Sequence, residues 1–214
     1  MQKKNVISYS LWGKGQKYRI GAIKNCELAP TIYPGWQLRF YIDDTIEKDF
    51  AKQLHDLGAE VYQIQETKGD FHGMYWRFFV NDDPTVNRYI IRDCDSRLNW
   101  RERAAVDDWI ASGKGFHIMR DHKNHIFAIQ GGMWGGKAGI VPNIQALIKN
   151  WNQYDRYACD QYFLTSVLYP MIKENAHVND EYYEHKPFPK HKPIDGGGWF
   201  VGQIFNEEGV PQKD

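Results

Sequence analysis

The sequence predicts an α/β protein with a mixed, mostly parallel central sheet flanked by helices. Its first half alternates short apolar runs with helical patterns, an order typical of a parallel sheet that helices cover on both faces. In the middle of the chain, Arg88–Arg97 (RYIIRDCDSR) begins as a short buried strand and runs straight into two aspartates. A length of 214 residues suits a single domain, 1–214, with a sizeable core.

Composition and charge argue against several classes of protein. The formal net charge is zero, whereas a broad nucleic-acid interface needs a basic excess, so we expect no nucleic-acid partner. No apolar run approaches the roughly 18–20 residues of a membrane span, and the N-terminus leads into a strand instead of a signal-peptide core. The cysteines Cys26, Cys94 and Cys159 are odd in number and widely spaced, which favours a reducing compartment. We therefore expect a cytoplasmic protein.

The elements of the first half follow from apolar spacing and helix stop signals. Strands are expected at Asn5–Ser10, Trp36–Ile42 and Glu60–Ile64, and helices at Tyr18–Leu28, before Pro30, and from caps at Asp43, Asp44 and Thr45 to Leu57. The loop Leu11–Tyr18 follows the first strand, where α/β folds bind nucleotides. It lacks the lysine–serine/threonine ending of a P-loop.

The second half predicts further helices and strands around the two aspartates. Helices are expected at Gly73–Val80, Asn99–Ser112 with Asn99 as its cap, Pro142–Trp151 and Asp160–Asn175, where Pro170 should kink or break the last one. A strand is expected at Phe116–Arg120, an extended segment at Ile126–Gln130, a glycine-rich turn at Gly131–Gly136, and an extended tail from His185 that wraps over the sheet.

The first candidate site is the pair Asp93 and Asp95 after the central strand. Residues two apart on a strand point to the same side, so both carboxylates can converge on one hard cation, Mn²⁺ or Mg²⁺. A bland alternative is that such aspartates only cap the next helix, which applies to Asp95 because it precedes Asn99 closely. A haloacid-dehalogenase-type phosphatase also uses D-x-D, but there the motif follows the first strand near the N-terminus. Here the triplet begins at residue 93, which disfavours that class.

Three segments in order carry a resemblance to a known family. They are Met74–Phe78, with Tyr75 and Arg77 two apart, then Asp93-Cys94-Asp95, then Asp160–Leu164 (DQYFL). The order resembles that of GT-A glycosyltransferases, in particular the glycogenin-like and lipopolysaccharide galactosyltransferases, which have a tyrosine-x-arginine helix, a D-x-D strand end and a D-Q-x-x-L segment. In size and pattern the chain is also similar to small glycosyltransferases encoded by large algal viruses and capsule clusters. The match covers roughly residues 70–165, and the ends of the chain only loosely.

The resemblance implies a GT-A (Rossmann-like) fold and a metal-dependent transferase. The enzyme would move a sugar from a nucleoside diphosphate, with UDP as the expected nucleotide, to a glycan or other hydroxyl acceptor. Asp93 and Asp95 would hold Mn²⁺ or Mg²⁺ against the diphosphate, because a cation stabilises the charge that builds on the departing nucleotide. Arg77 would reach the donor or brace the aspartates, its alternative being a surface arginine on an amphipathic helix.

Other residues would complete the donor and reaction sites. The base and ribose would be held by Tyr9, Leu11 and Trp12, by their position after the first strand. Asp160 and Gln161 would lie near the reacting carbon, where an inverting enzyme needs a carboxylate base and a retaining one a nucleophile or charge stabiliser. The alternative for Asp160 is a helix N-cap.

Arginines near the aspartates are candidates for phosphate contacts, because a guanidinium matches phosphate geometry. Arg92 and Arg97 are assigned to the donor, and Arg97 is favoured. Some arginines of this stretch are expected to be plain surface charges on the following helix.

Acceptor and metal candidates complete the set. Asp121 and His122 are expected to bind sugar hydroxyls, the alternative being a solvated loop. Trp134 is expected to stack on a sugar, the alternative being a core tryptophan in a tight turn. Relatives have a late metal-ligating histidine within H-x-x-G-x-x-K-P, a pattern from which this chain departs. His185 and His191 both remain possible, and we favour His191 as the third ligand.

Two other functions stay open. A nucleotidyltransferase shares the nucleotide-binding half and uses carboxylates with Mg²⁺, although the chain has only a faint echo of its signature at Gly13-Lys14-Gly15. A non-catalytic carbohydrate-binding protein would use the aromatic residues, which make up 15% of the chain.

Overall fold

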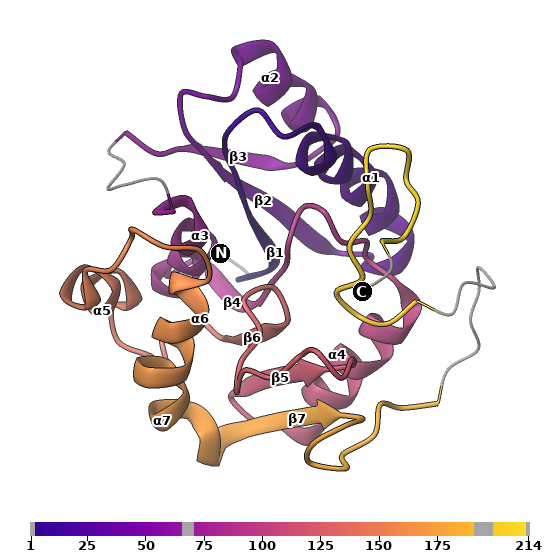
Figure 1. Ribbon diagram of the computed structural model, residues 1–214, viewed down its shortest axis with the longest axis vertical. Helices are drawn as coiled ribbons and strands as arrows, with labels where there is room; N and C mark the ends of the chain where they lie inside the picture. The colour runs from indigo at the N-terminus through magenta and orange to yellow at the C-terminus, as the bar shows by residue number, and fades with distance from the viewer. Residues whose placement is uncertain (1–2, 66–70, 191–198, 213–214) are drawn as a thin grey trace.

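The centre of the molecule is a seven-stranded sheet in the computed structural model, which describes residues 3–65, 71–190 and 199–212 (Figure 1). Its strands, in the spatial order β3-β2-β1-β4-β6-β5-β7, are β1 (Lys4–Leu11), β2 (Trp36–Ile42), β3 (Glu60–Gln63), β4 (Val86–Ile91), β5 (Phe116–Arg120), β6 (Trp134–Lys137) and β7 (Ala176–Asp180). Strand β6 is antiparallel to both of its neighbours, and every other adjacent pair is parallel. The predicted mixed, mostly parallel sheet is confirmed.

Helices flank this sheet and bury its two faces in separate apolar clusters (Figure 1). The helical segments are α1 (Gln16–Ile32), α2 (Lys48–Asp56), α3 (Gly73–Trp76) with the 3₁₀ turn Arg77–Asp82, α4 (Trp100–Ser112), α5 (Ile144–Trp151), α6 (Cys159–Phe163) and α7 (Tyr169–Ile172). In β1, Val6 belongs to the cluster with α3 and α6, whereas Ile7 belongs to the cluster with α1 and α4. The alternation is that of a strand buried on both faces.

The glycine-rich stretch Gly131–Gly136 begins as the predicted turn and continues as a strand, which was not predicted. Strand β6 occupies Trp134–Lys137 and pairs with both β4 and β5. A Cβ on Gly135 would lie 2.5 Å from the Tyr89 carbonyl oxygen, and one on Gly136 would lie 2.9 Å from the Phe116 ring. Glycine is therefore what allows β6 to fit in the middle of the sheet. The expected extension at Ile126–Gln130 is an irregular loop.

Several helix limits differ from those predicted. Helix α1 continues past Pro30 to Ile32, because Ala29 and Ile32 are buried against the core. Helix α2 begins at Lys48, after Glu47, and not at the predicted caps 43–45. The chain also stays helical through Pro170, since a π-helical segment, Leu164–Leu168, precedes it. A wider turn accommodates the proline ring and its missing N–H, so the predicted break does not occur.

The last described residues pack at one end of the sheet. Phe188 and Val201 are buried together with Met119 and Met133. The Phe205 N–H donates to the Asp95 carbonyl oxygen at 2.9 Å, which fixes the tail beside the aspartate loop. In the described part of the chain, no helix has the length and apolar character needed to cross a membrane.

Candidate functional site

The structure has a cavity of about 700 Å³ at the carboxyl ends of β1 and β4. These two strands are where the parallel order reverses, because β2 and β3 extend from β1 on one side and β6 follows β4 on the other. Ligands of open α/β sheets bind at this switch point, outside the carboxyl ends of the strands. The lining residues include Ser10, Leu11, Trp12, Tyr18, Arg77, Asp93, Asp95, His122, His125, Gly131, Gly132, Tyr157, Asp160, Gln161 and Phe200.

Asp93 and Asp95 both line this cavity, in the loop directly after β4. The Cys94 side chain between them is buried, and its thiol lies 3.3 Å from the Ser10 carbonyl oxygen. Both aspartates border one cavity, as predicted, although they lie in a turn after β4 and not in the strand itself. The Asp93 side chain is 45% exposed and that of Asp95 only 8%, so Asp93 is the more open of the two to a ligand.

Arg77 joins two of the carboxylates. Its Nη1 pairs with Asp93, and its Nη2 lies 2.8 Å from Oδ2 of Asp160. Two serines of β1 hold the arginine's backbone, because Ser8 Oγ donates to the Arg77 carbonyl oxygen and the Arg77 N–H donates to Ser10 Oγ. Burial acts to lower the pKa of Arg77, but the two aspartates outweigh it and raise that pKa. A permanently charged guanidinium thus fixes the spacing of the carboxylates.

Asp160 is buried at the floor of this arrangement. It is the second residue of α6 and not its N-cap, which is Ala158. Its Oδ1 accepts from the Gln161 N–H at 2.9 Å. Burial raises the pKa of Asp160, Arg77 lowers it, and the charge of Asp93 raises it again. The net shift is upward, so Asp160 takes a proton more readily than an ordinary aspartate.

Asp95 has an ion pair that the sequence did not suggest. Nζ of Lys17, in the first turn of α1, lies 2.8 Å from its Oδ2. Burial raises the pKa of Asp95, the charge of Asp93 raises it further, and Lys17 acts against both. The two neighbouring carboxylates therefore repel one another, and a cation between them would relieve that repulsion.

Gly131 and Gly132 allow the chain to pass directly over the carboxylates. A Cβ on Gly131 would lie 2.6 Å from Asp160 Oδ2, and one on Gly132 would overlap the Asp93 carboxylate. Only a residue without a side chain permits this approach. Gly131 and Gly132 form a turn, as the sequence predicts, and that turn lies in the site.

Three predicted donor or sugar residues lie outside the cavity, and these predictions are corrected. Tyr9 is fully buried and stacks on Phe40, with ring centroids 4.9 Å apart. Trp134 is fully buried in the core beside Phe78, so it offers no face to a sugar.

The third, Arg92, is 2% exposed, and its Nε lies 3.0 Å from Glu102 of α4. It holds the helix to the strand end instead of facing a phosphate. Because the Arg92 and Glu102 side chains are both buried, the Arg92 guanidinium does not reach the cavity. The predicted contact of Arg92 with the donor is therefore excluded.

Arg97 and Asp121 serve structural contacts. The Arg97 side chain is buried over the Phe205 ring, and its Nη1 donates to the Ser96 carbonyl oxygen at 3.0 Å. Asp121 accepts two bonds of 2.7 Å from Arg101 and one of 2.8 Å from the Val201 N–H. Asp121 is 4% exposed and does not line the cavity, so the structure contradicts its predicted sugar contact.

The remaining predicted residues lie in the cavity or outside the described chain. Leu11, Trp12, His122 and Gln161 line the cavity. His191 lies outside the described residues. His125, from the same polar loop as His122, also lines the cavity. Residues that the sequence did not single out are Lys17, Tyr18, Tyr157 and Phe200. Tyr157 is 75% exposed at the mouth of the cavity, where no apolar period marks it.

The donor set suits a hard divalent cation. In the described ranges, no group of three or more His, Cys, Asp or Glu side chains is arranged to hold a metal. Mg²⁺ and similar ions, however, are commonly held by one or two carboxylates together with substrate phosphates and water. Asp93 and Asp95 supply such a pair of oxygen ligands beside open volume. The residues present therefore fit a cation that arrives with a phosphate-bearing ligand.

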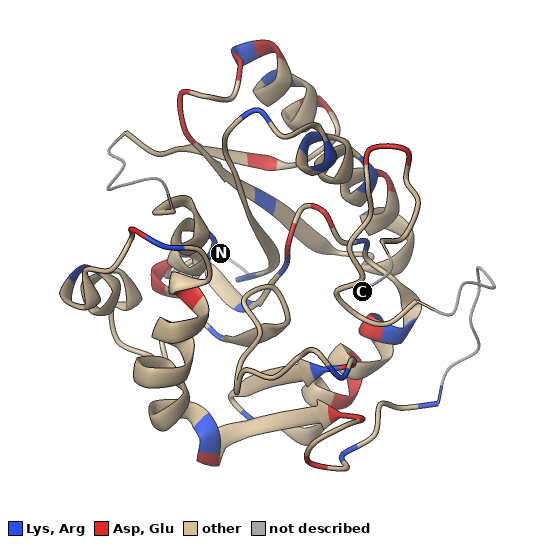
Figure 2. Ribbon diagram, in the orientation of Figure 1, with Lys and Arg blue, Asp and Glu red and all other residues tan. Residues whose placement is uncertain are grey.

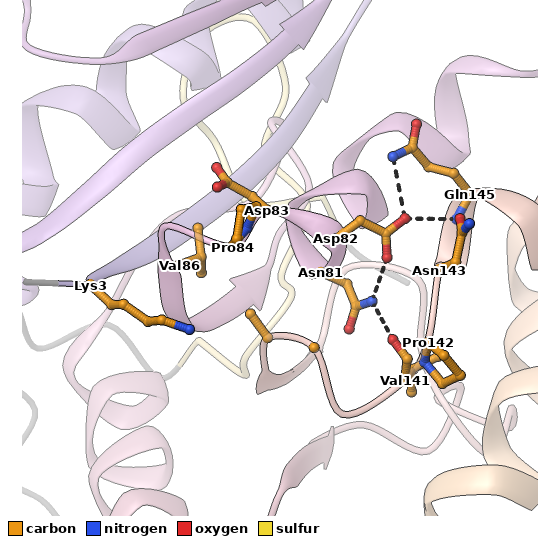
Figure 3. A pocket seen from close by; sticks show the side chains of 12 residues that line it. Lys3, Asn81, Asp82, Asp83, Pro84, Val86, Val141, Pro142, Asn143 and Gln145 are labelled. Atoms are coloured by element: carbon orange, nitrogen blue, oxygen red, sulfur yellow. Dashed lines mark hydrogen bonds between the residues drawn. The ribbon is translucent and has the colours of Figure 1, made fainter. Parts of the chain in front are cut away.

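A second cavity, of about 570 Å³, lies at the opposite end of β4 (Figure 3). Its acidic residues already have partners. Asp82 accepts from the backbone N–H groups of Ile144 and Gln145, at 2.8 and 3.1 Å, at the start of α5. Asp83 lies 2.8 Å from Arg39. These contacts connect helices to the sheet, and the cavity at the switch point remains the better candidate for a functional site.

Basic and acidic residues are interspersed along the ribbon (Figure 2).

Comparisons with known proteins identify the fold. No protein-family model and no curated protein matches the sequence. Among solved structures, the chain is similar to a glycosyltransferase involved in glycosylation of the major capsid of PBCV-1, with 13% identity and a TM-score of 0.50 over 85% of this chain and 83% of that one. It is also similar to glucosyl-3-phosphoglycerate synthase from Mycobacterium tuberculosis in complex with Mn²⁺, UDP and glucosyl-3-phosphoglycerate, with 10% identity and a TM-score of 0.50 over 90% and 74% of the two chains.

A nucleotidyltransferase is among the similar structures too. It is 4-diphosphocytidyl-2C-methyl-D-erythritol synthase from Anaerococcus prevotii, with 9% identity and a TM-score of 0.50 over 89% of this chain and 92% of that one. At these identities the likeness concerns the fold. The chain has the GT-A (Rossmann-like) fold, and the solved structures that it resembles include glycosyltransferases.

Proposed function

We propose that the protein is a metal-dependent glycosyltransferase that moves a sugar from a nucleoside diphosphate, with UDP as the preferred nucleotide, to a glycan or other hydroxyl acceptor. One observation carries the proposal. Asp93, Asp95 and Asp160 line one cavity at the switch point of a GT-A fold, and Arg77 ties Asp93 to Asp160. Similar structures include a UDP- and Mn²⁺-bound glycosyltransferase, which supports the choice of nucleotide and cation.

The donor's diphosphate would lie over Asp93 and Asp95, which would hold Mn²⁺ or Mg²⁺. A bound cation there stabilises the negative charge on the departing nucleoside diphosphate. Leu11 and Trp12, after β1, line the part of the cavity that would take the base and ribose. Arg77 is a positioning residue in this scheme, because its two terminal nitrogens, Nη1 and Nη2, already pair with carboxylates.

Asp160 is placed to act at the sugar. Its carboxylate would accept the acceptor's proton as the new glycosidic bond forms, or would stabilise charge on the opposite face of the sugar. The upward shift of its pKa suits the first role, since a stronger base accepts a proton more readily. Gln161 lies beside it and holds the Gly131 N–H through its side-chain oxygen, at 3.4 Å.

The acceptor would enter on the side of His122 and Phe200. Their rings stack with centroids 4.4 Å apart, and both side chains line the cavity. Aromatic faces of this kind suit the apolar faces of sugars. We therefore assign acceptor binding to His122, and no longer to Asp121 or Trp134, which do not line the cavity.

Release of nucleoside diphosphate from UDP-sugars, with Mn²⁺ and a panel of hydroxyl acceptors, tests the proposed function. Asp160→Asn should lower the rate at least about a hundredfold, the range of general base catalysis. Asp107→Asn is the matched control and should keep the wild-type rate, because Asp107 of α4 is 52% exposed, pairs with Arg103 and does not line the cavity. Wild-type protein that releases no UDP from any donor would contradict the proposal.

The nucleotidyltransferase alternative is supported by the similar structure of that class. It predicts pyrophosphate release from a nucleoside triphosphate and a sugar phosphate. Pyrophosphate release without UDP release from UDP-sugars would establish the alternative. Glycan binding that needs neither metal nor nucleotide would instead indicate a non-catalytic carbohydrate-binding protein.

A further inference from the structure

Lys17 occupies the side of Asp95 where the metal is proposed to bind. Its Nζ lies 2.8 Å from Oδ2 of a carboxylate that is only 8% exposed. Within residues 3–65, 71–190 and 199–212, Lys17 is the cation that pairs with Asp95. A divalent cation at Asp95 would repel the nearby Lys17 ammonium, so the two cations compete for this carboxylate.

The charges around the cavity explain why a cation is held there. Asp93, Asp95 and Asp160 line the cavity, and Arg77 is the positive side chain that lines it with them. Arg77 is already engaged by Asp93 and Asp160. Arg97 also interacts with Asp95 electrostatically, but without Lys17 the carboxylate would lose its ion-pair partner, which is costly in a partly desolvated place. Lys17 therefore balances Asp95 while no metal is bound.

Lys17 is held by fewer ionic contacts than Arg77: its ammonium pairs with Asp95 and lies 4.7 Å from the centroid of the Tyr18 ring, whereas Arg77 pairs with two carboxylates. The Lys17 side chain is 28% exposed, and it extends from the first turn of α1, next to the lining residues Gly15 and Tyr18. A lysine has a long flexible stem, and its ammonium binds phosphate as a point charge. When a metal takes Asp95, the nearest new anion is the diphosphate that arrives with the metal.

We propose that Lys17 is an internal cation that holds Asp95 in the free protein and moves to the donor's diphosphate when Mn²⁺ or Mg²⁺ binds. This inference rests on the proposed function. It makes metal and nucleotide depend on one another, since metal alone must displace Lys17 without a new partner for the ammonium. With nucleotide present the ammonium has such a partner. Linkage then requires that each ligand strengthen the binding of the other by the same factor.

Mn²⁺ binding without nucleotide, measured by electron paramagnetic resonance of the free ion, is the first test. Lys17→Met should bind Mn²⁺ about fivefold more tightly than wild type, the value of a partly exposed ion pair. Lys14→Met is the matched control, because Lys14 is an exposed lysine in the loop just before α1 and its loss changes the net charge equally. It should bind Mn²⁺ as wild type does. Mn²⁺ affinity equal in Lys17→Met and wild type would overturn the proposal.

UDP binding in saturating Mn²⁺, measured by calorimetry, is the second test. Lys17→Met should bind UDP about fivefold more weakly, and Lys17→Arg, which keeps the charge, should stay close to wild type. Unchanged UDP affinity in Lys17→Met would overturn the transfer of the ammonium to the diphosphate. Tighter Mn²⁺ binding by Lys17→Met in a protein that never binds UDP would instead sink the proposed function and leave the competition for Asp95 intact.

Discussion

Two glycines control how close the backbone lies to the carboxylates. Gly132 lies against Asp93, and Gly131 against Asp160 and Arg77. The ion pairs of Arg77 set the spacing between Asp93 and Asp160, so any atom added above them changes the position of a proposed metal ligand. The glycines are therefore part of the site although they carry no functional group.

Gly132→Ala should weaken Mn²⁺-dependent UDP binding at least about tenfold, because substituting a residue that positions a metal ligand commonly lowers metal affinity by that factor. Its new Cβ would overlap the Asp93 carboxylate and force it away from Arg77. Calorimetry with UDP measures the effect. Gly139→Ala is the control: its φ of +79° makes alanine strained, but no atom lies within 4 Å of the added Cβ. It should lose about 1 kcal/mol of unfolding free energy and keep UDP binding. Equal UDP affinity in Gly132→Ala and wild type would argue against a role for this close approach.

The side-chain orientation of a residue was predictable from the sequence where the local strand or helix pattern determines it. Asp93 and Asp95 follow a strand two residues apart, so their convergence on one site was predicted. Tyr9 and Arg92 were misplaced because their directions depend on distant partners, Phe40 and Glu102. Lys17 was missed for the same reason, since Asp95 lies far from it in the sequence.

Helix α4 follows the aspartate loop and carries Glu102, the buried partner of Arg92. The Asn99 side chain accepts from the Glu102 N–H at 2.8 Å, which satisfies one of the open donors at the helix start. The predicted cap is confirmed. Its position matters for the site, because the loop with Asp93 and Asp95 ends at this cap.

Asn99→Ala should lower the free energy of unfolding by about 1 kcal/mol, and the melting temperature by roughly 2–4 °C for a chain of this size. Thermal unfolding followed by circular dichroism measures both. Asn87→Ala, at an exposed asparagine of β4, should change the unfolding free energy by less than about 0.5 kcal/mol. Equal melting temperatures for the two variants would contradict the role of the cap.

Elements with a strong apolar period were predicted well, and glycine-rich or polar ones were not. Strand β2 has the predicted limits, Trp36–Ile42, since its apolar residues alternate regularly. Strand β6 carries two glycines in four residues, so no side-chain period marks it. Strand β7 (AHVND) is short and polar and was not predicted, because the last predicted helix ends at Asn175, directly before it. Both owe their strand structure to pairing with β5, which is a long-range contact.

Across the whole molecule, the chain order of the first half decides where the cavity lies. Strands β1 and β4 are neighbours with the parallel strands β2 and β3 on one side. Their carboxyl ends, Leu11 and Ile91, bring the first loop and the aspartate loop together. The fold class was predictable because this order follows from alternating strands and helices. The packing of α6 and the tail against the aspartates depends on contacts that no local pattern encodes.

The central claim is that Asp93 and Asp95 hold a divalent cation against a nucleoside diphosphate. Calorimetric titration of UDP into the protein, with Mn²⁺ and with a chelator instead of Mn²⁺, tests it directly. Wild type should bind UDP with Mn²⁺ and lose that binding in the chelator. Asp95→Asn, which keeps the shape of the side chain, should lose at least about tenfold in affinity, and Asp107→Asn should not. UDP affinity that is the same with and without Mn²⁺, or the same in Asp95→Asn and wild type, would contradict the claim.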